Sequence, residues 1–445
     1  MPREAAVIGL GRSGVAATRL LRREEVPVYA SDARRDPSLE STAEGLRALG
    51  ASVELGGHDL ARIGRAALCI VSPGVPPDAP PIAAARAAGV PVRAEAELGL
   101  EALAGVPYIA VTGTNGKTTT TALIGHLLAA GGRRASAVGN IGRPLSDLAL
   151  ATQRPEWLAV ELSSFQLHDM PSIRPTIGVL TNLAPDHLDR YPALEDYYAD
   201  KRLLYRNAGP ESVWVINTDD ADSRALAAGV AGRQLRFSVR ERADAWYDRA
   251  PGLLRLGGEQ LLPRRELALL GDHNVANALA AALAVRAAGV GIPLLAEGLR
   301  SFLALPHRME PIREVDGVLY LNDSKATNIS STEVAVAALD RPFVLLLGGR
   351  HKGEPYTRLG PLLRRRCRAV IVYGEAEPLV RRDLAGAGVP LERGGGGSFD
   401  EVMARARSLA RPGDAVLLSP ACSSYDMFSN YEERGRRFRE IVERW

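Results

Sequence analysis

Short apolar runs recur along the chain and alternate with segments whose apolar residues follow a helical period. Each run is rich in Val, Ile, Leu and Ala and is followed by glycine or polar residues, which is typical of buried parallel strands. Strands that alternate with helices predict an α/β protein. The predicted strands cover residues 5–9, 26–30, 67–71, 90–93, 108–111, 135–138, 157–160, 177–180, 319–321, 343–347, 369–372 and 416–418.

With 445 residues, the chain is too long for one ordinary hydrophobic core, and the pattern predicts three domains. Residues 1–98 predict a Rossmann-like N-terminal domain. Residues 99–304 predict a central P-loop domain built on a parallel sheet, and residues 305–445 a C-terminal Rossmann-like α/β domain.

The first strand runs into a glycine turn, Gly9-Leu10-Gly11-Arg12-Ser13-Gly14, and the second strand ends at Asp32. This arrangement is the G-x-G-x-x-G turn and acidic strand end of a β-α-β nucleotide-binding unit. The turn could bind a dinucleotide, and Asp32 could equally reach the ribose or base of another nucleotide.

A second glycine turn, Gly113 to Gly116, lies between a β-prone run and a helical segment that ends at Gly131-Gly132. Such a loop directs backbone N–H groups at an anion, while Lys117 adds a positive charge and the Thr118 hydroxyl can hold magnesium. The common G-x-x-x-x-G-K-[ST] spacing would need glycine at Val111, so this loop is shorter. We expect it to bind phosphate rather than to form an ordinary turn with a solvated lysine.

Lysine is rare in this chain: only four of the 55 basic side chains are lysine, at positions 117, 201, 325 and 352. A chain that otherwise uses arginine has kept lysine where a compact ammonium or a reactive amine is required. All four lysines are therefore site candidates, against the alternative that they are surface residues retained by chance.

The charge balance and the apolar stretches exclude several classes of partner. The 55 basic and 52 acidic side chains leave a net charge of +3, without an arm suited to nucleic acid. The most apolar stretch, residues 276–290, carries Arg286 and is too short to cross a bilayer. Three scattered cysteines, and a start that runs directly into a strand, predict a cytoplasmic protein without a signal peptide; we expect a monomer.

Polar residues follow several predicted strands, where ligands of parallel sheets gather. Glu161 and His187 leave two such strands as candidates for a metal ligand or a base. Asn140 lies in a glycine-rich turn and Asn274 at the start of a long Ala-rich helix, and each could contact a ligand or serve structure alone. In the third domain the loops 322–328, 348–354 and 419–424 carry the polar groups.

Together these motifs resemble the Mur ligases of bacterial cell-wall synthesis, and among them most closely the branch that adds D-glutamate. The resemblance covers nearly the whole chain, in order. The motifs are Thr112 to Thr119, Glu161 to Ser164, Asp186-His187, Gly271-x-His273-Asn274, Pro306-His307-Arg308, Asp323 to Asn328 and Ser419 to Cys422.

The resemblance implies an ATP-dependent ligase that joins D-glutamate to UDP-N-acetylmuramoyl-L-alanine through an acyl phosphate, in peptidoglycan precursor synthesis. It implies catalytic roles for Lys117, Lys201, His187 and Lys325. Two magnesium ions are implied, with Thr118, Glu161, His187 and a carbamylated Lys201 as ligands. The implied ATP-binding residues are Gly113, Thr114, Asn115, Gly116, Lys117, Thr118, Thr119, Asn274, Arg308, Asp323 and Lys325.

The same resemblance implies two substrate pockets. The implied uridine diphosphate residues are Ser13, Gly14, Asp32, Arg34, Gly74 and Asn140. The implied D-glutamate residues are Thr327, Lys352, Ser424 and Tyr431. The chain departs from the usual family pattern at Arg12-Ser13, His351, Tyr425 and Tyr431, all of them next to these pockets.

Two rival functions compete with this interpretation. A ligase resembling folylpolyglutamate synthase shares the short phosphate loop but has no uridine-binding first domain; Asp32 and the turn at Ser72-Pro73-Gly74 argue against it. A nucleotide-regulated binding protein without chemistry would have no use for so many polar strand ends.

Overall fold

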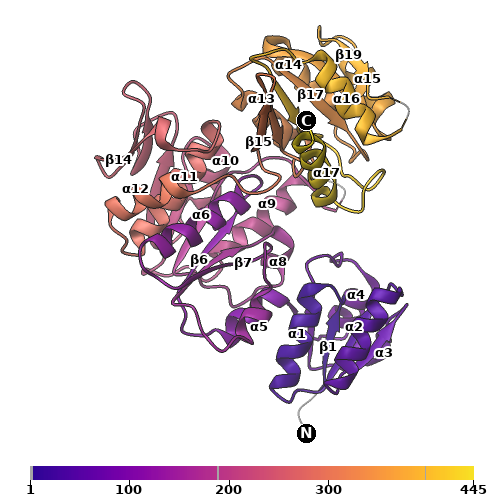
Figure 1. Ribbon diagram of the computed structural model, residues 1–445. Coiled ribbons are helices and arrows are strands. Elements are labelled where there is room, and N and C mark those ends of the chain that lie inside the picture. Colours follow the sequence, from indigo (N-terminus) through magenta and orange to yellow (C-terminus); the bar gives the residue numbers. More distant parts are fainter. Residues whose placement is uncertain (1–3, 188–189, 396) are drawn as a thin grey trace. The chain divides into compact units, whose positions relative to one another are not determined.

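The computed structural model describes residues 4–187, 190–395 and 397–445, and these residues form three sheets (Figure 1). By their contacts they form two compact units. One comprises Met1–Leu262 and Asn277–Leu299, and the other comprises Pro263–Ala276 and Arg300–Trp445. The three-domain α/β architecture is confirmed, whereas the borders at 98/99 and 304/305 stay predictions.

The first sheet has five parallel strands in the order β3-β2-β1-β4-β5. This order is that of a Rossmann-like sheet, as predicted. Its strands are β1 (Ala5–Ile8), β2 (Val28–Asp32), β3 (Ser52–Leu55), β4 (Leu68–Val71) and β5 (Val92–Ala94). Its helices are α1 (Arg12–Arg23), α2 (Pro37–Ala48), α3 (Leu60–Ile63) and α4 (Pro80–Ala87).

The second sheet has nine strands in the order β14-β13-β12-β11-β10-β9-β6-β8-β7. Strands β6 to β12 pair in parallel, and β13 reverses direction against β12. The strands are β6 (Tyr108–Thr112), β7 (Ala135–Gly139), β8 (Trp157–Glu161), β9 (Ile177–Leu180), β10 (Val213–Asn217), β11 (Arg233–Ser238), β12 (Ala245–Asp248), β13 (Leu253–Leu256) and β14 (Glu259–Pro263).

Strands β10 to β14 lie outside the set that the sequence pattern predicts. The helices of this part of the chain are α5 (Glu95–Ala102), α6 (Lys117–Ala130), α7 (Leu145–Ala149), α8 (Ser164–His168), α9 (Leu194–Arg202), α10 (Ala221–Ala227), α11 (Asp272–Ala287) and α12 (Ile292–Ser301). Helix α9 ends at Arg202, and a single 3-10 turn, Leu203–Tyr205, follows it.

The third sheet has six strands in the order β15-β16-β20-β17-β18-β19, of which only β15 is antiparallel. Its strands are β15 (Glu310–Val315), β16 (Val318–Asn322), β17 (Phe343–Gly348), β18 (Cys367–Tyr373), β19 (Leu391–Arg393) and β20 (Ala415–Leu418). Helices α13 (Ile329–Ala338), α14 (Gly360–Arg366), α15 (Glu377–Leu384), α16 (Phe399–Leu409) and α17 (Tyr431–Glu443) complete this unit.

The first two sheets belong to one unit because helix α5 joins them. α5 buries five residues in a row, and an apolar core continues from Leu20 through Leu98 to Leu145 and Val160. At its start, Glu95 accepts a hydrogen bond of 2.6 Å from the backbone N–H of Ser146 in α7.

Among the described residues, no helix is both long and apolar enough to cross a membrane.

Gly99 allows α5 and α7 to approach closely, because a Cβ there would lie 2.4 Å from the Leu145 Cβ. We therefore predict that Gly99→Ala destabilises the first unit by about 1–3 kcal/mol through overpacking. Gly45→Ala in α2 is the matched control, since nothing lies within 4 Å of a Cβ at that position. Thermal unfolding should show a lower Tm for Gly99→Ala only; equal Tm values would contradict close packing at α5.

Candidate active site

The phosphate loop connects β6 to α6 and requires glycine at two positions. Gly113 has φ 142° and Gly116 has φ 82°. A Cβ at Gly113 would lie 2.0 Å from the Thr181 hydroxyl, and one at Gly116 would lie 2.3 Å from Oδ1 of Asn277. Contacts with other segments therefore require glycine at both ends of this short loop. Gly116 has no side chain to cap α6, and a helix N-terminus without a side-chain cap is suited to binding an anion.

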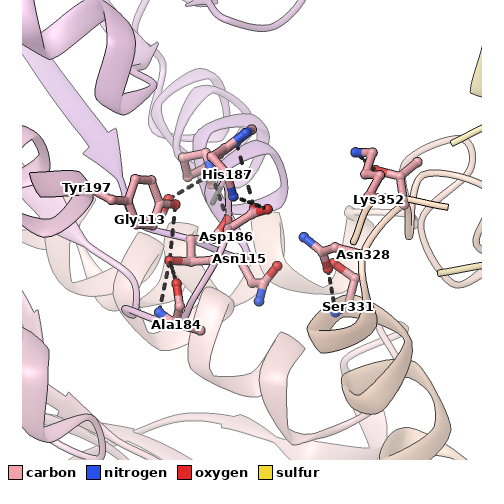
Figure 2. A network of polar contacts seen from close by, with 12 residues as sticks. Gly113, Asn115, Ala184, Asp186, His187, Tyr197, Asn328, Ser331 and Lys352 are labelled. Carbon is pink, nitrogen blue, oxygen red and sulfur yellow. Dashed lines mark hydrogen bonds and ion pairs between the residues drawn. The ribbon is translucent and has the colours of Figure 1, made fainter. Parts of the chain in front are cut away.

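A second loop, at residues 181–184, supports this turn from beneath. The Asn115 N–H donates to Asn182 Oδ1 at 3.0 Å, and Asn182 Nδ2 donates to the Asn115 carbonyl at 2.9 Å. The Thr114 hydroxyl donates to the Ala184 carbonyl and accepts from the Ala184 N–H, both at 3.0 Å (Figure 2). Asn182 is a supporting residue that the sequence does not reveal, because an asparagine after a strand carries no signal of a partner 67 residues away.

Two lysines converge on the carbonyl of Gly113. Lys117 Nζ donates to it at 2.7 Å, and Lys201 Nζ donates to it at 2.8 Å. Lys201 is 1% exposed, and its Nζ lies 4.5 Å from the centre of the Tyr197 ring. The structure thus brings together two of the four lysines that their rarity singled out.

Burial lowers the pKa of Lys201 well below its ordinary value, and the nearby charge of Lys117 lowers it further. The acidic groups of Asp186, Asp200 and Glu161 act in the opposite direction. A lowered pKa favours the neutral form of a lysine, and a neutral amine is the form that can react.

Glu161 ends β8 and is 2% exposed. Its Oε1 accepts a hydrogen bond of 3.2 Å from Asn140 Nδ2, and its Oε2 has no hydrogen-bond partner among the described residues. A buried carboxylate oxygen without a donor is suited to a cation.

His187 follows β9 in a left-handed conformation, with φ 57°. Its ring lies edge-on to Phe165 at 5.2 Å between centres, and its Nε2 lies 3.8 Å from Asp186 Oδ2. Among residues 4–187, 190–395 and 397–445, no group of three or more His, Cys, Asp or Glu side chains is placed to hold a metal. Glu161 and His187 would need further ligands, such as the Thr118 hydroxyl, a phosphate oxygen or a carbamate on Lys201.

A cavity of about 820 Å³ lies beside the C-terminal ends of the first sheet's strands. Five of the six predicted uridine-diphosphate residues line it: Ser13, Asp32, Arg34, Gly74 and Asn140. Gly14 does not line it. A Cβ at Gly14 would lie 1.8 Å from the Gly9 carbonyl, so Gly14 serves the packing of the turn. Arg12 and His58 also line the cavity, and His58 was not predicted.

Both carboxylate oxygens of Asp32 accept hydrogen bonds from other residues of the protein. Its carboxylate accepts from the Leu10 N–H at 2.9 Å and from the Arg34 N–H at 2.9 Å. Burial alone would raise the pKa of Asp32, but hydrogen bonds from Arg34 and Leu10 outweigh burial and lower it. Asp32 is therefore ionised, and it orients the glycine turn as well as facing the cavity.

In the second unit, Asp323 is buried at the end of β16. Its carboxylate accepts from the Met309 N–H at 3.1 Å and from the Ser419 hydroxyl at 2.9 Å. Burial raises the pKa of Asp323 to about 7. Lys325 follows, with its Nζ 5.2 Å from the centre of the Tyr431 ring.

Two of the residues that are predicted to bind the amino acid contact each other in this unit, while the pocket itself stays a prediction. Lys352 Nζ donates to the Thr327 hydroxyl at 3.3 Å (Figure 2). Ser424 is 2% exposed, and Tyr425 beside it is 63% exposed. The Nδ1 atom of His351 lies 3.0 Å from the Tyr356 hydroxyl.

Arg434 is a supporting residue that the sequence analysis missed. It is fully buried, and its guanidinium donates to the Ser324 carbonyl at 2.7 Å and to the Cys422 carbonyl at 3.2 Å. One side chain therefore fixes both loops that carry predicted site residues. Its partner Ser324 lies 110 residues away in the sequence, so no local pattern reveals the contact.

Asn274 and Arg308 also belong to the second unit. Asn274 Nδ2 donates to the Leu270 carbonyl at 2.8 Å in the first turn of α11, so its amide has a structural role already. The assignment of Asn274, Arg308, Asp323 and Lys325 to ATP stays a prediction.

Comparisons with known proteins match all three parts of the chain. Residues 3–94 match the N-terminal domain of MurD-like Mur ligases, residues 111–285 the Mur ligase middle domain, and residues 307–422 the glutamate ligase domain of Mur ligases. A relative from Myxococcus xanthus, named UDP-N-acetylmuramoylalanine--D-glutamate ligase, is 42% identical over 98% of this chain and 97% of its own. A relative of the same name from Salinibacter ruber is 41% identical over 99% and 97%.

Solved structures share the fold at lower identity. The UDP-N-acetylmuramate-alanine ligase MurC from Thermotoga maritima is 18% identical, with a TM-score of 0.63 over 99% of both chains. A pseudomurein peptide ligase type C from Methanothermus fervidus is 20% identical, with the same TM-score and the same coverage.

Proposed function

This chain belongs to the Mur ligase family of ATP-dependent ligases, and we propose the residues through which it joins D-glutamate to UDP-N-acetylmuramoyl-L-alanine. The product is a peptidoglycan precursor. The observation that carries this proposal is the convergence of Lys117 and Lys201 on the carbonyl of Gly113, at the open N-terminus of α6. We further propose a monomer that acts in the cytoplasm, where ATP and nucleotide-linked substrates are available.

The nucleotide end of the first substrate is proposed to lie in the cavity of the first sheet. The glycine turn and the N-terminus of α1 face the diphosphate there, with Ser13 and Asn140 as hydrogen-bonding side chains. Asp32 and Arg34 hold each other at 3.2 Å and form one wall. A ligase resembling folylpolyglutamate synthase would have no need of this cavity.

The first chemical step activates a carboxylate, which is a poor acyl donor. An oxygen of the L-alanyl carboxylate attacks the γ-phosphorus of ATP, and ADP leaves, so that an acyl phosphate forms. Negative charge gathers on phosphate oxygens in this step, and catalysis is chiefly positioning and charge stabilisation. Lys117, the N–H groups of α6 and Lys325 are proposed to supply it.

Bound magnesium would neutralise phosphate charge, with Thr118, Glu161, His187 and a carbamylated Lys201 as its proposed ligands. The orphaned Oε2 of Glu161 fits such an ion. Carbamylation also fits Lys201, because a neutral amine adds CO2 and releases one proton. The resulting anion would lie where two lysines now meet.

In the second step, the amine of D-glutamate loses a proton and attacks the acyl carbon. The tetrahedral intermediate then expels phosphate and leaves the amide. Lys352 and Thr327, with Ser424 and Tyr431, are proposed to bind D-glutamate. His187 is the candidate base, provided that it is not committed to metal.

The proposed reaction predicts ADP release that requires both UDP-N-acetylmuramoyl-L-alanine and D-glutamate. A coupled assay for ADP measures it, with each substrate omitted in turn and with a folate substrate as the alternative acceptor. ADP formation without D-glutamate, or with the folate alone, would contradict the proposed function.

Lys201→Arg keeps a positive charge but cannot form a carbamate. We predict a loss of turnover of at least about 100-fold, because a guanidinium is also too large for the space between the Gly113 carbonyl and Tyr197. Lys201→Met, which has a similar length without charge, is the control for size and should lose activity equally. A fully active Lys201→Arg variant would show that carbamylation is unnecessary.

Lys352→Arg tests the amino-acid pocket. A guanidinium replaces the compact ammonium that donates to Thr327, so we predict a KM for D-glutamate raised about tenfold with the KM for ATP little changed. Steady-state kinetics with each substrate varied in turn measures both KM values. An unchanged KM for D-glutamate would remove Lys352 from that pocket.

A further inference from the structure

Helix α9, which carries Lys201, is joined to its surroundings by the carboxylate of Asp200, which has one partner in helix α8 and one in the segment before α9. The Asp200 Oδ1 lies 2.8 Å from His168 Nδ1, and the Tyr191 hydroxyl donates to Asp200 Oδ2 at 2.9 Å. An ionised carboxylate can only accept, so His168 Nδ1 is the donor. Both oxygens of Asp200 are thus fixed from outside α9.

The buried apolar packing of α9 comes from one residue, Tyr197, whose ring contacts Tyr191 and His187. Of its nine residues only Tyr197 and Lys201 are buried, and one of these is an amine. Neighbouring residues of a helix point about 100° apart, so Asp200 can face α8 while Lys201 faces the phosphate loop. A contact that fixes the direction of Asp200 therefore also fixes the direction of Lys201.

α8 is a firm anchor for this contact. It begins three residues after Glu161, and Ser163 and Gln166 close its first turn with a reciprocal capping box. Phe165 in α8 stacks on Tyr191 at 5.3 Å between centres, with 12° between the rings, and lies edge-on to His187. The segments that carry His187 and Lys201 thus meet α8 around one aromatic cluster, to which Tyr197 of α9 belongs, and Asp200 lies at its edge.

We propose that His168 and Asp200 are positioning residues that hold Lys201 against the Gly113 carbonyl. They act through the rotation of α9 and touch no substrate. This role rests on the proposed function of Lys201. Neither residue belongs to the motifs that carry the family resemblance.

The pair is partly exposed, with side-chain exposures of 44% for His168 and 15% for Asp200. Exposed ion pairs contribute little to global stability. The loss of this pair should therefore be visible in turnover rather than in folding.

The test compares steady-state kinetics of His168→Ala, His168→Asn and wild type in the ADP-release assay. A small misplacement of a catalytic group lowers the rate by up to about 100-fold, so we expect kcat of His168→Ala to fall at least tenfold. All three KM values should stay within twofold. His168→Asn should recover most of kcat, because the asparagine amide can donate from the position of Nδ1. Thermal unfolding of each variant confirms that it is folded.

The matched control is Arg86→Ala. Arg86 Nη2 pairs with Asp169, the residue after His168, at the same distance of 2.8 Å and with similar exposures of 37% and 14%. Arg86 lies in α4, so this pair does not contact α9. Its loss should therefore leave kcat within twofold of wild type.

A fully active His168→Ala would overturn the positioning role, as would an equal loss of kcat in Arg86→Ala or a loss confined to KM. A fully active Lys201→Arg would remove the residue being positioned and overturn the inference together with that part of the proposed function. If wild type released no ADP under any condition, the ligase function itself would fail.

Discussion

The site depends on one constraint, which is that two lysine nitrogens share the carbonyl oxygen of Gly113. Two ammonium groups this close repel each other strongly where water is excluded. The structure meets this constraint by burying Lys201, which favours the neutral amine, and by placing Asp186 and Glu161 in range. An anion added beside these two amines would lower their mutual repulsion further.

The loop that supplies this carbonyl owes its shape to the segments around it. Thr181 leaves no room for a side chain at Gly113, and Asn277 leaves none at Gly116. Asn182 hydrogen-bonds both the N–H and the carbonyl of Asn115. Backbone donors held in this way need not reorganise when charge develops on a phosphate. The loop and its supports are thus one preorganised element, in which a substitution at Asn182 or Asn277 would act on phosphate binding without touching phosphate.

The sequence predicted many of the strands whose residues are buried on both sides, although β10 is buried in the same way and was missed. β1, β4 and β17 are continuous apolar runs, and each was found. Strands β13 and β14 were not found, because they are short and only partly buried, so polar residues interrupt their apolar pattern. In the site, the rarity of lysine and the ends of strands pointed to Lys117, Lys201 and Glu161. Asn182, Arg434 and His168 were missed, since each acts through a partner that only the fold brings near.

The choice between lysine and arginine now has a structural reason. Arginine serves where a fixed fork of donors is wanted: Arg434 bridges two buried carbonyls, and Arg368 pairs with both oxygens of Asp414. Lys201 occupies a place where a planar, permanently charged group would fit neither the space nor the electrostatics. A compact amine there can donate to Gly113, lie against the Tyr197 ring and lose its proton. The helix that carries it must then be oriented by other side chains, because a single flexible amine cannot orient a helix by itself.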